Sequence, residues 1–136
     1  NVVGDKCLTP DVEIESSLEA MSQRWGIDSI KDYDSKTYFR SNRKAQAGDY
    51  VTYKFKEAVK CSMIIVETGI PNIDFYGVTD GILEYSYNGV DFIKGAEFTD
   101  NVATLHPDKP IKAVRISVTA PNDAHTLCLQ DIKVVE

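Results

Sequence analysis

The chain has 136 residues, of which 43% are hydrophobic and 26% are charged, as expected for one globular domain and not for a disordered segment. Its 15 Lys and Arg residues and 21 Asp and Glu residues give a formal net charge of −6. Because an acidic surface repels phosphate groups, this charge disfavours binding to nucleic acids and to anionic lipid. The longest apolar run, Met-Ile-Ile-Val at 63–66, is far shorter than the roughly 20 residues of a membrane span.

The N-terminal segment carries few signals of its own. We expect residues 1–10 to form a linker or a first strand, and residues 11–136 to form a single domain. The chain starts without a methionine and without the basic and apolar regions of a signal peptide, which favours a segment of a longer or processed protein. Beyond this segment, only residues 18–23 have the composition of a helix, and it would be short.

Most of the chain has a hydrophobic period of two, which predicts β-strands. Residues 51–55 alternate cleanly, and residues 113–119 do so as Ala-Val-Arg-Ile-Ser-Val-Thr. Residues 127–134 alternate in two halves whose phase shifts by one residue at Gln130-Asp131. A shift of this kind predicts a β-bulge.

Two further segments support an all-β fold. Residues 61–67 are apolar except for Ser62 and the final Glu67, which predicts a strand covered on both faces. Residues 82–87 and 90–93 flank Asn88-Gly89, a pair typical of a two-residue type I′ hairpin turn. Successive strands separated by turn residues predict an all-β sandwich or barrel.

Two long polar segments interrupt the strands, at residues 26–49 and 69–81. Loops of this length without regular structure are commonly functional or organised by a ligand. In the first, Asp32, Asp34 and Thr37 place oxygen atoms in one tight loop, the donors that Ca²⁺ prefers. The alternative is an Asp-rich turn whose side chains bond their own backbone.

Three cysteines, Cys7, Cys61 and Cys128, are too few for a disulfide framework and include no CxxC pair. We expect mostly buried, free thiols, with one disulfide and one free thiol as the alternative. Sequence motifs for catalysis are also lacking: there is no HExxH, GxSxG, GxGxxG or phosphate-binding loop. The sequence therefore disfavours an enzyme.

The two long loops contain candidates for sugar recognition. Phe75 and Tyr76 lie between turn residues and could present an aromatic platform, although packing in the core is the alternative for each aromatic side chain. Arg40, Asn42 and Arg43 follow the Asp-rich loop and could bond sugar hydroxyls. Their alternative is a solvated loop with local hydrogen bonds.

Several motifs, taken in order, resemble a known family. Residues 32–41 read Asp-Tyr-Asp-Ser-Lys-Thr-Tyr-Phe-Arg-Ser and resemble the D-G-D-x-x-T-x-W-x-S signature of discoidin-like domains. These domains, also called coagulation factor V/VIII type C domains, include the family 32 carbohydrate-binding modules. Residues 83–92 resemble the family's E-x-S-x-D-G-x-x-W hairpin. Residues 48–55, 113–116 and 127–134 are similar to three of its other strands.

The resemblance implies a fold and a class of function. The fold is an eight-stranded jelly-roll β-sandwich of the galactose-binding-like type. The function is that of a non-catalytic module that targets a glycoside hydrolase to a glycan containing N-acetylglucosamine or galactose. Residues 34–41 and 48–51 look particularly like modules of bacterial β-N-acetylhexosaminidases, chitobiases and hyaluronidases. Such enzymes are secreted, periplasmic or at the cell surface.

The same resemblance implies a structural Ca²⁺ with five ligands: the carbonyl of Lys31 and the side chains of Asp32, Asp34, Thr37 and Asp131. Two departures weaken this set, because Tyr33 replaces the glycine of the turn and Asp131 replaces a longer glutamate.

The galactose site is less well preserved. Arg40 stands where these modules carry a histidine, and Glu67-Thr68 stand where they carry an arginine. A different sugar could bind the same loops through Arg40, Asn42, Arg43, Phe75 and Tyr76. Two alternatives stay open: a structural module that packs on the catalytic domain without binding sugar, and a lipid-binding discoidin-type domain, which the net charge disfavours.

Overall fold

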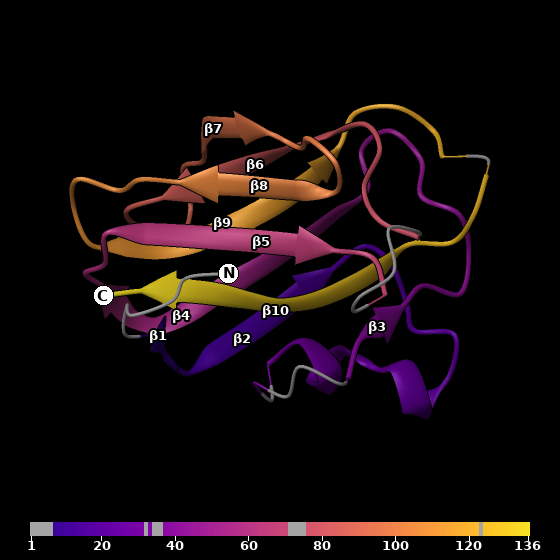
Figure 1. The fold of residues 1–136 in the computed structure, drawn as a ribbon, viewed down its shortest axis with the longest axis horizontal. Helices are drawn as coiled ribbons and strands as arrows, with labels where there is room; N and C mark the ends of the chain where they lie inside the picture. Colours follow the sequence, from indigo (N-terminus) through magenta and orange to yellow (C-terminus); the bar gives the residue numbers. More distant parts are fainter. Residues whose placement is uncertain (1–6, 32, 34–36, 71–75, 123) are drawn as a thin grey trace.

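The computed structural model describes residues 7–31, 33, 37–70, 76–122 and 124–136. These residues form two antiparallel sheets that face one another as a β-sandwich (Figure 1). The all-β fold predicted from the alternation is therefore confirmed. No helix in the described residues is both long and apolar enough to cross a membrane.

Each sheet has five strands within the described part of the chain. One sheet has the order β1-β10-β5-β8, with β3 also paired to β10, and its strands are β1 (Cys7–Leu8), β3 (Phe39–Arg40), β5 (Met63–Thr68), β8 (Val102–Leu105) and β10 (Cys128–Val135). The other has the order β2-β4-β9-β6-β7, and its strands are β2 (Val12–Ser16), β4 (Tyr50–Val59), β6 (Gly81–Ser86), β7 (Ile93–Glu97) and β9 (Ile111–Val118). Two 3₁₀ turns, η1 (Gln23–Trp25) and η2 (Ile27–Ile30), precede β3.

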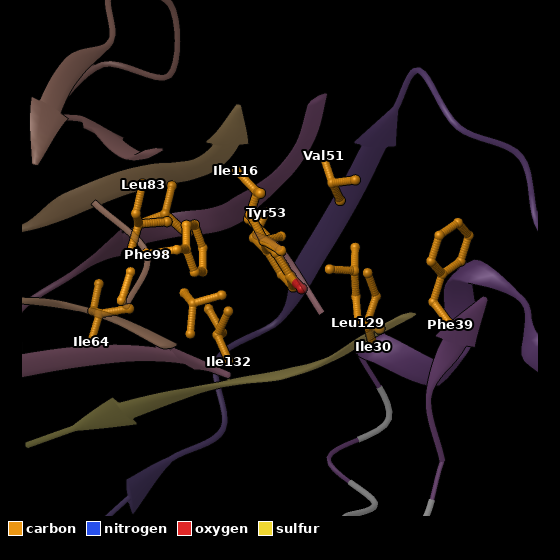
Figure 2. Close-up of a cluster of buried hydrophobic side chains, with 14 of the residues drawn as sticks. Ile30, Phe39, Val51, Tyr53, Ile64, Leu83, Phe98, Ile116, Leu129 and Ile132 are labelled. Carbon is orange, nitrogen blue, oxygen red and sulfur yellow. The ribbon is translucent and has the colours of Figure 1, made fainter. Parts of the chain in front are cut away.

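The core lies between the sheets and is built from the inward set of each alternating strand (Figure 2). Tyr53 is fully buried, and its hydroxyl donates a 2.9 Å hydrogen bond to the carbonyl of Gln130. Phe39, at the place of the motif tryptophan, is also fully buried. The motif aromatic therefore anchors β3 in the core and is not available to a ligand.

The strongest strand predictions are confirmed in register as well as in position. In β9, Val114, Ile116 and Val118 are buried, as the alternation required. In β10, the pairing with β5 shifts between Leu129 and Ile132, which is the predicted bulge.

Two predictions about local structure are wrong. Residues 18–22 form no helix, because Ala20 pairs with Ser41 in an isolated bridge and Leu18 is buried in the core, and Gln23 only begins the 3₁₀ turn η1. Strand β5 is not covered on both faces: buried residues alternate with half-buried ones along it. Strand β5 begins at Met63, after the polar Ser62. The apolar run of the sequence therefore overstated the burial of the strand.

The hairpin of β6 and β7 forms, but without the predicted two-residue turn. Its first pair joins Tyr85 to Ile93, so a longer loop connects the strands. Within it the side chain of Asn88 accepts hydrogen bonds of 2.8 Å from the N–H groups of Val90 and Asp91. An Asx turn of this kind replaces the backbone turn.

A tight turn with the predicted backbone lies elsewhere in the chain. Asp100 and Asn101 have φ values of 51° and 68°, and the flanking Thr99 and Val102 exchange two backbone hydrogen bonds. Positive φ at both central residues is the signature of a type I′ turn. Asn and Asp are the side chains that tolerate it best after glycine.

All three cysteines lie in described residues and carry free thiols. Cys128 is buried, and burial raises the pKa of its thiol to about 11. Cys61 is half-buried, whereas Cys7 is exposed on the edge strand β1. The expectation of free thiols is confirmed, and that of burial holds for Cys128 but not for Cys7.

Candidate functional site

The candidate site lies at the end of the sandwich where β5 and β9 end and β10 begins (Figure 1). Backbone hydrogen bonds join the connecting segments there. The N–H of Asn122 donates to the carbonyl of Ala45 over 2.9 Å, and the N–H of Cys128 donates to that of Tyr76 over 2.7 Å. The segments before β4, before β6 and before β10 are therefore fixed relative to one another.

Three half-buried side chains meet at this end: Arg40, Tyr76 and His125. The guanidinium carbon of Arg40 lies 4.9 Å from the centroid of the Tyr76 ring. The rings of Tyr76 and His125 are 5.2 Å apart between centroids and meet edge to face. We call these three residues the Arg40 cluster. It combines an aromatic surface with a fixed cation.

Arg40 is held in place by the strand that carries it. Strand β3 pairs with β10 through Arg40 and Cys128, which brings residue 40 next to the segment that precedes β10. There Arg40 Nε donates a 3.1 Å hydrogen bond to the hydroxyl of Thr126. A guanidinium has five N–H donors in one plane, a geometry suited to adjacent oxygen atoms.

Tyr76 has an uncommon backbone conformation, with φ of 67°. Left-handed φ is rare for side chains other than those of Gly, Asn and Asp. Here it is held by the hydrogen bond from Cys128 and by the next residues, since the N–H of Val78 donates to the hydroxyl of Thr68 over 2.9 Å. Residues in such conformations are concentrated at ligand-binding sites.

The orientation of His125 follows from its contacts. Its Nδ1 lies 2.8 Å from the carbonyl of Thr126, which can only accept a hydrogen bond. The same Nδ1 lies 3.3 Å from Nδ2 of Asn122, so two neighbouring residues hold the ring in place. An imidazole beside the guanidinium of Arg40 could bind adjacent hydroxyl groups of one ligand.

Arg43, predicted to contact sugar, is instead paired within the protein. Its guanidinium donates two hydrogen bonds of 2.7 Å to the carboxylate of Asp49, whose side chain is only 8% exposed. These bonds lower the pKa of Asp49 to about 2, with smaller contributions from Gln46 N–H and the Ser17 hydroxyl, against burial, which raises it. The structure therefore gives Arg43 the role of fixing the loop before β4.

The two remaining predicted sugar contacts are not part of the cluster. Asn42 is exposed, and its backbone N–H donates to the carbonyl of Glu19 over 2.8 Å. Phe75 lies outside the described residues. The structure thus brings Arg40 and Tyr76 together and adds His125 and Thr126, which sequence reasoning missed.

The predicted calcium ligands are only in part within the described residues, since Asp32 and Asp34 lie outside them. The hydroxyl of Thr37 donates to the carbonyl of Ser29 over 3.1 Å, so its lone pairs could still face a cation. The carboxylate oxygens of Asp131 are buried. The described members of the set thus offer oxygen atoms, the ligands that Ca²⁺ prefers.

Tyr33, which replaces the glycine of the turn, keeps a left-handed backbone with φ of 55°. Its hydroxyl donates to the carbonyl of Pro10. Burial raises the pKa of Tyr33 to about 12, and the negative charge of Asp131 adds to the effect. Asp131 is therefore close enough to this loop to affect its electrostatics. In the described part of the chain, no three His, Cys, Asp or Glu side chains gather as they would around a metal ion.

Comparison with known proteins gives matches at the level of structure alone. No family model matches the sequence, and the curated proteins give no significant match. Among solved structures, the family 32 CBM of NanJ from Clostridium perfringens, in complex with galactose, has 17% identity and a TM-score of 0.70. The match covers 97% of this chain and 99% of that one.

Two further structures have the same fold over nearly their whole length. CpGH89CBM32-5 from Clostridium perfringens, in complex with GalNAc-β-1,3-galactose, has 13% identity and a TM-score of 0.73, and the match covers 96% of this chain and 100% of that one. Chitosan-binding module 1 of a chitosanase/glucanase from Paenibacillus sp. IK-5 has 10% identity and a TM-score of 0.71, with 95% and 98% covered. The resemblance to discoidin-like domains is thereby confirmed in three dimensions, and this chain has the fold of the family 32 carbohydrate-binding modules.

Proposed function

We propose that this chain is a non-catalytic carbohydrate-binding module and that the Arg40 cluster is its sugar site. The observation that carries the proposal is the cluster itself: an aromatic ring, a guanidinium and an imidazole fixed at one end of the sandwich. Aromatic rings with a few oriented polar groups are how small-molecule sites combine affinity with orientation.

The identity of the sugar is proposed from the solved structures. Two of them hold galactose or GalNAc-β-1,3-galactose, and a third is chitosan-binding. A glycan with terminal galactose, N-acetylgalactosamine or N-acetylglucosamine is the corresponding ligand for this chain. We further propose that the module targets a glycoside hydrolase of the β-N-acetylhexosaminidase or chitobiase type, and that the enzyme is secreted, periplasmic or at the cell surface.

A structural Ca²⁺ is part of the proposal. The Lys31 carbonyl and the oxygen atoms of Asp32, Asp34, Thr37 and Asp131 would hold it. Such an ion would fix the segment between η2 and β3, which leads directly into Arg40. It would stabilise the site without touching the sugar.

The experiment for the proposed function is isothermal titration of the module with galactose, N-acetylgalactosamine, N-acetylglucosamine and chito-oligosaccharides. A site of this size is expected to bind with Kd of about 0.1–1 mM, or about −4 to −5.5 kcal/mol. Binding by the wild type and its loss in Tyr76→Ala would support the proposal. Lack of binding to every sugar at millimolar concentration would overturn it, and would favour a module that packs on its catalytic domain.

A further inference from the structure

A pocket lies at the opposite end of the sandwich from the Arg40 cluster. It has a volume of about 350 Å³ and opens where β6 and β8 end and β9 begins (Figure 1). This volume is within the range of small-molecule sites, roughly 300–1,000 Å³. The residues that carry the argument are Tyr85, Tyr87, Gly95, Leu105, Asp108 and Ile111.

One part of the pocket wall is apolar and aromatic, and the rest is polar. Leu105 and Ile111 are buried at 6% and 0% exposure and belong to the hydrophobic core. Tyr85 and Tyr87 are half-buried, and their ring centroids lie 5.5 Å apart at 74°. Two tyrosines that meet at this angle present surfaces of different orientation to the same space.

The wall of the pocket is closely packed at Gly95 on the edge strand β7. A Cβ atom at this position would lie 2.3 Å from Cδ2 of Leu105 and 3.0 Å from both Cδ1 of Tyr85 and the backbone oxygen of Leu83. Glycine thus lets β7 pack closely against Leu105 and Tyr85 in the wall of the pocket.

Charged groups lie beside the second tyrosine. The hydroxyl of Tyr87 donates a 3.1 Å hydrogen bond to Oδ1 of Asp108. The ammonium of Lys109 lies 4.4 Å from the centroid of the Tyr87 ring. A carboxylate is thus held at the hydroxyl of Tyr87 and an ammonium over its ring, and the lining of the pocket adds the ammonium of Lys94.

From this arrangement we propose a second carbohydrate site, which takes a single neutral pyranose ring. The apolar C–H face of the ring packs on the tyrosines, and adjacent hydroxyl groups bond Asp108 and Lys94. A neutral sugar matches a lining that contains one carboxylate, Asp108, and one ammonium, Lys94. The inference goes beyond the proposed function, because the residues involved are separate from the Arg40 cluster.

Two sites at opposite ends would change what the module can do. They lie at opposite ends of the sandwich, so one short glycan cannot fill both (Figure 1). One module would instead connect two glycan chains, and a polymer with many branches would be bound through both ends. Linked sites of this kind raise overall affinity without any new contact.

The test is a titration of the ¹⁵N-labelled module followed by NMR, with galactose, N-acetylgalactosamine and N-acetylglucosamine as probes up to tens of millimolar. The expected result is a saturable shift of the amide signals of Gly95, His106 and Ile111 with at least one sugar. Asp108→Asn and Tyr87→Ser should each raise the Kd obtained from these shifts at least tenfold. Because Asp108 is exposed, its variant keeps the test valid if Tyr87→Ser fails to fold.

The matched control is Tyr76→Ala, which should leave the shifts at Gly95 unchanged while it removes those at His125. If the proposed function is wrong, only the sugar-dependent shift at His125 will be missing. The two proposals can therefore fail independently. The absence of any saturable shift at Gly95, His106 and Ile111 with all three sugars would overturn the second site. Shifts that persist unchanged in both Asp108→Asn and Tyr87→Ser would overturn it as well.

Discussion

The guanidinium of Arg43 donates two 2.7 Å hydrogen bonds to the carboxylate of Asp49, whereas Arg40, three residues earlier, stacks against Tyr76. The two arginines therefore have different tasks. One joins two parts of a loop, and the other forms part of a surface that a ligand could reach. Their proximity in the chain makes them a matched pair for experiment.

Substitution of each arginine by glutamine should separate binding from stability. Arg40→Gln should weaken sugar binding at least tenfold with a small change in stability, because it removes donors from the cluster. Arg43→Gln should keep the affinity and lower the free energy of unfolding by about 1–3 kcal/mol, because it removes both guanidinium hydrogen bonds from the buried carboxylate of Asp49. Titration calorimetry and urea unfolding of both variants check the prediction, and equal affinities for both would contradict it.

The ion pair of Arg43 also predicts a dependence of stability on pH. The pKa of Asp49 is about 2 in the folded chain, below its ordinary value of 3.8. A lowered pKa stabilises the fold above pH 4, and this contribution is lost as the pH falls from about 4 towards 2. We expect a loss of about 1–2 kcal/mol, because the Arg43 side chain is 47% exposed and solvent screens the pair.

Urea unfolding at several pH values between 2 and 6 (a range set by the two pKa values) measures this loss. The comparison is Asp49→Asn, which should be less stable at pH 6 and should lose less stability on acidification. A parallel decline of wild type and variant would show that other carboxylates cause the acid sensitivity.

The calcium proposal predicts a metal-dependent melting temperature. An ion that binds only the folded chain raises its stability by RT ln(1 + [Ca²⁺]/Kd), about 2.7 kcal/mol at a hundredfold excess over Kd. Thermal melts in EDTA and in excess Ca²⁺ should therefore differ. The difference should vanish in Asp131→Asn, and identical melts of the wild type under both conditions would exclude the ion.

The hydroxyl of Tyr53 provides a test of the core. It is buried and bonds the carbonyl of Gln130 at the bulge of β10. Tyr53→Phe leaves that carbonyl without this donor, and should lower the free energy of unfolding by about 1–2 kcal/mol. Tyr50→Phe, on the same strand but exposed, is the control and should change it little. Chemical denaturation compares the two, and equal effects would contradict the role given to this hydrogen bond.

The tight turn at residues 100 and 101 gives a prediction about backbone conformation. Asp100 has φ of 51° and is exposed, so its side chain contributes little packing. Asp100→Ala should destabilise the protein by about 1 kcal/mol, whereas Asp100→Gly should be tolerated, because glycine adopts positive φ without strain. Thermal unfolding of both variants measures the difference, and a more stable alanine variant would contradict the assigned turn.

The strands could be predicted from the sequence because their alternation is a local property. Val114, Ile116 and Val118 face the core for the same reason that they alternate with polar residues. The bulge at Gln130-Asp131 could also be predicted, because one extra residue reverses the phase of the hydrophobic alternation. The turn between β6 and β7 was not, because the Asn88 side chain competes with the backbone for the same N–H groups.

The candidate site depended on contacts that no local pattern encodes. The sequence by itself determined the all-β class, the order of the main strands and two of the cluster residues, Arg40 and Tyr76. Only the tertiary structure decided that β3 pairs with β10, which brings His125 within reach of both. The tertiary structure also decided that Arg43 pairs with Asp49, because the partner of a loop arginine depends on which carboxylate the fold places beside it.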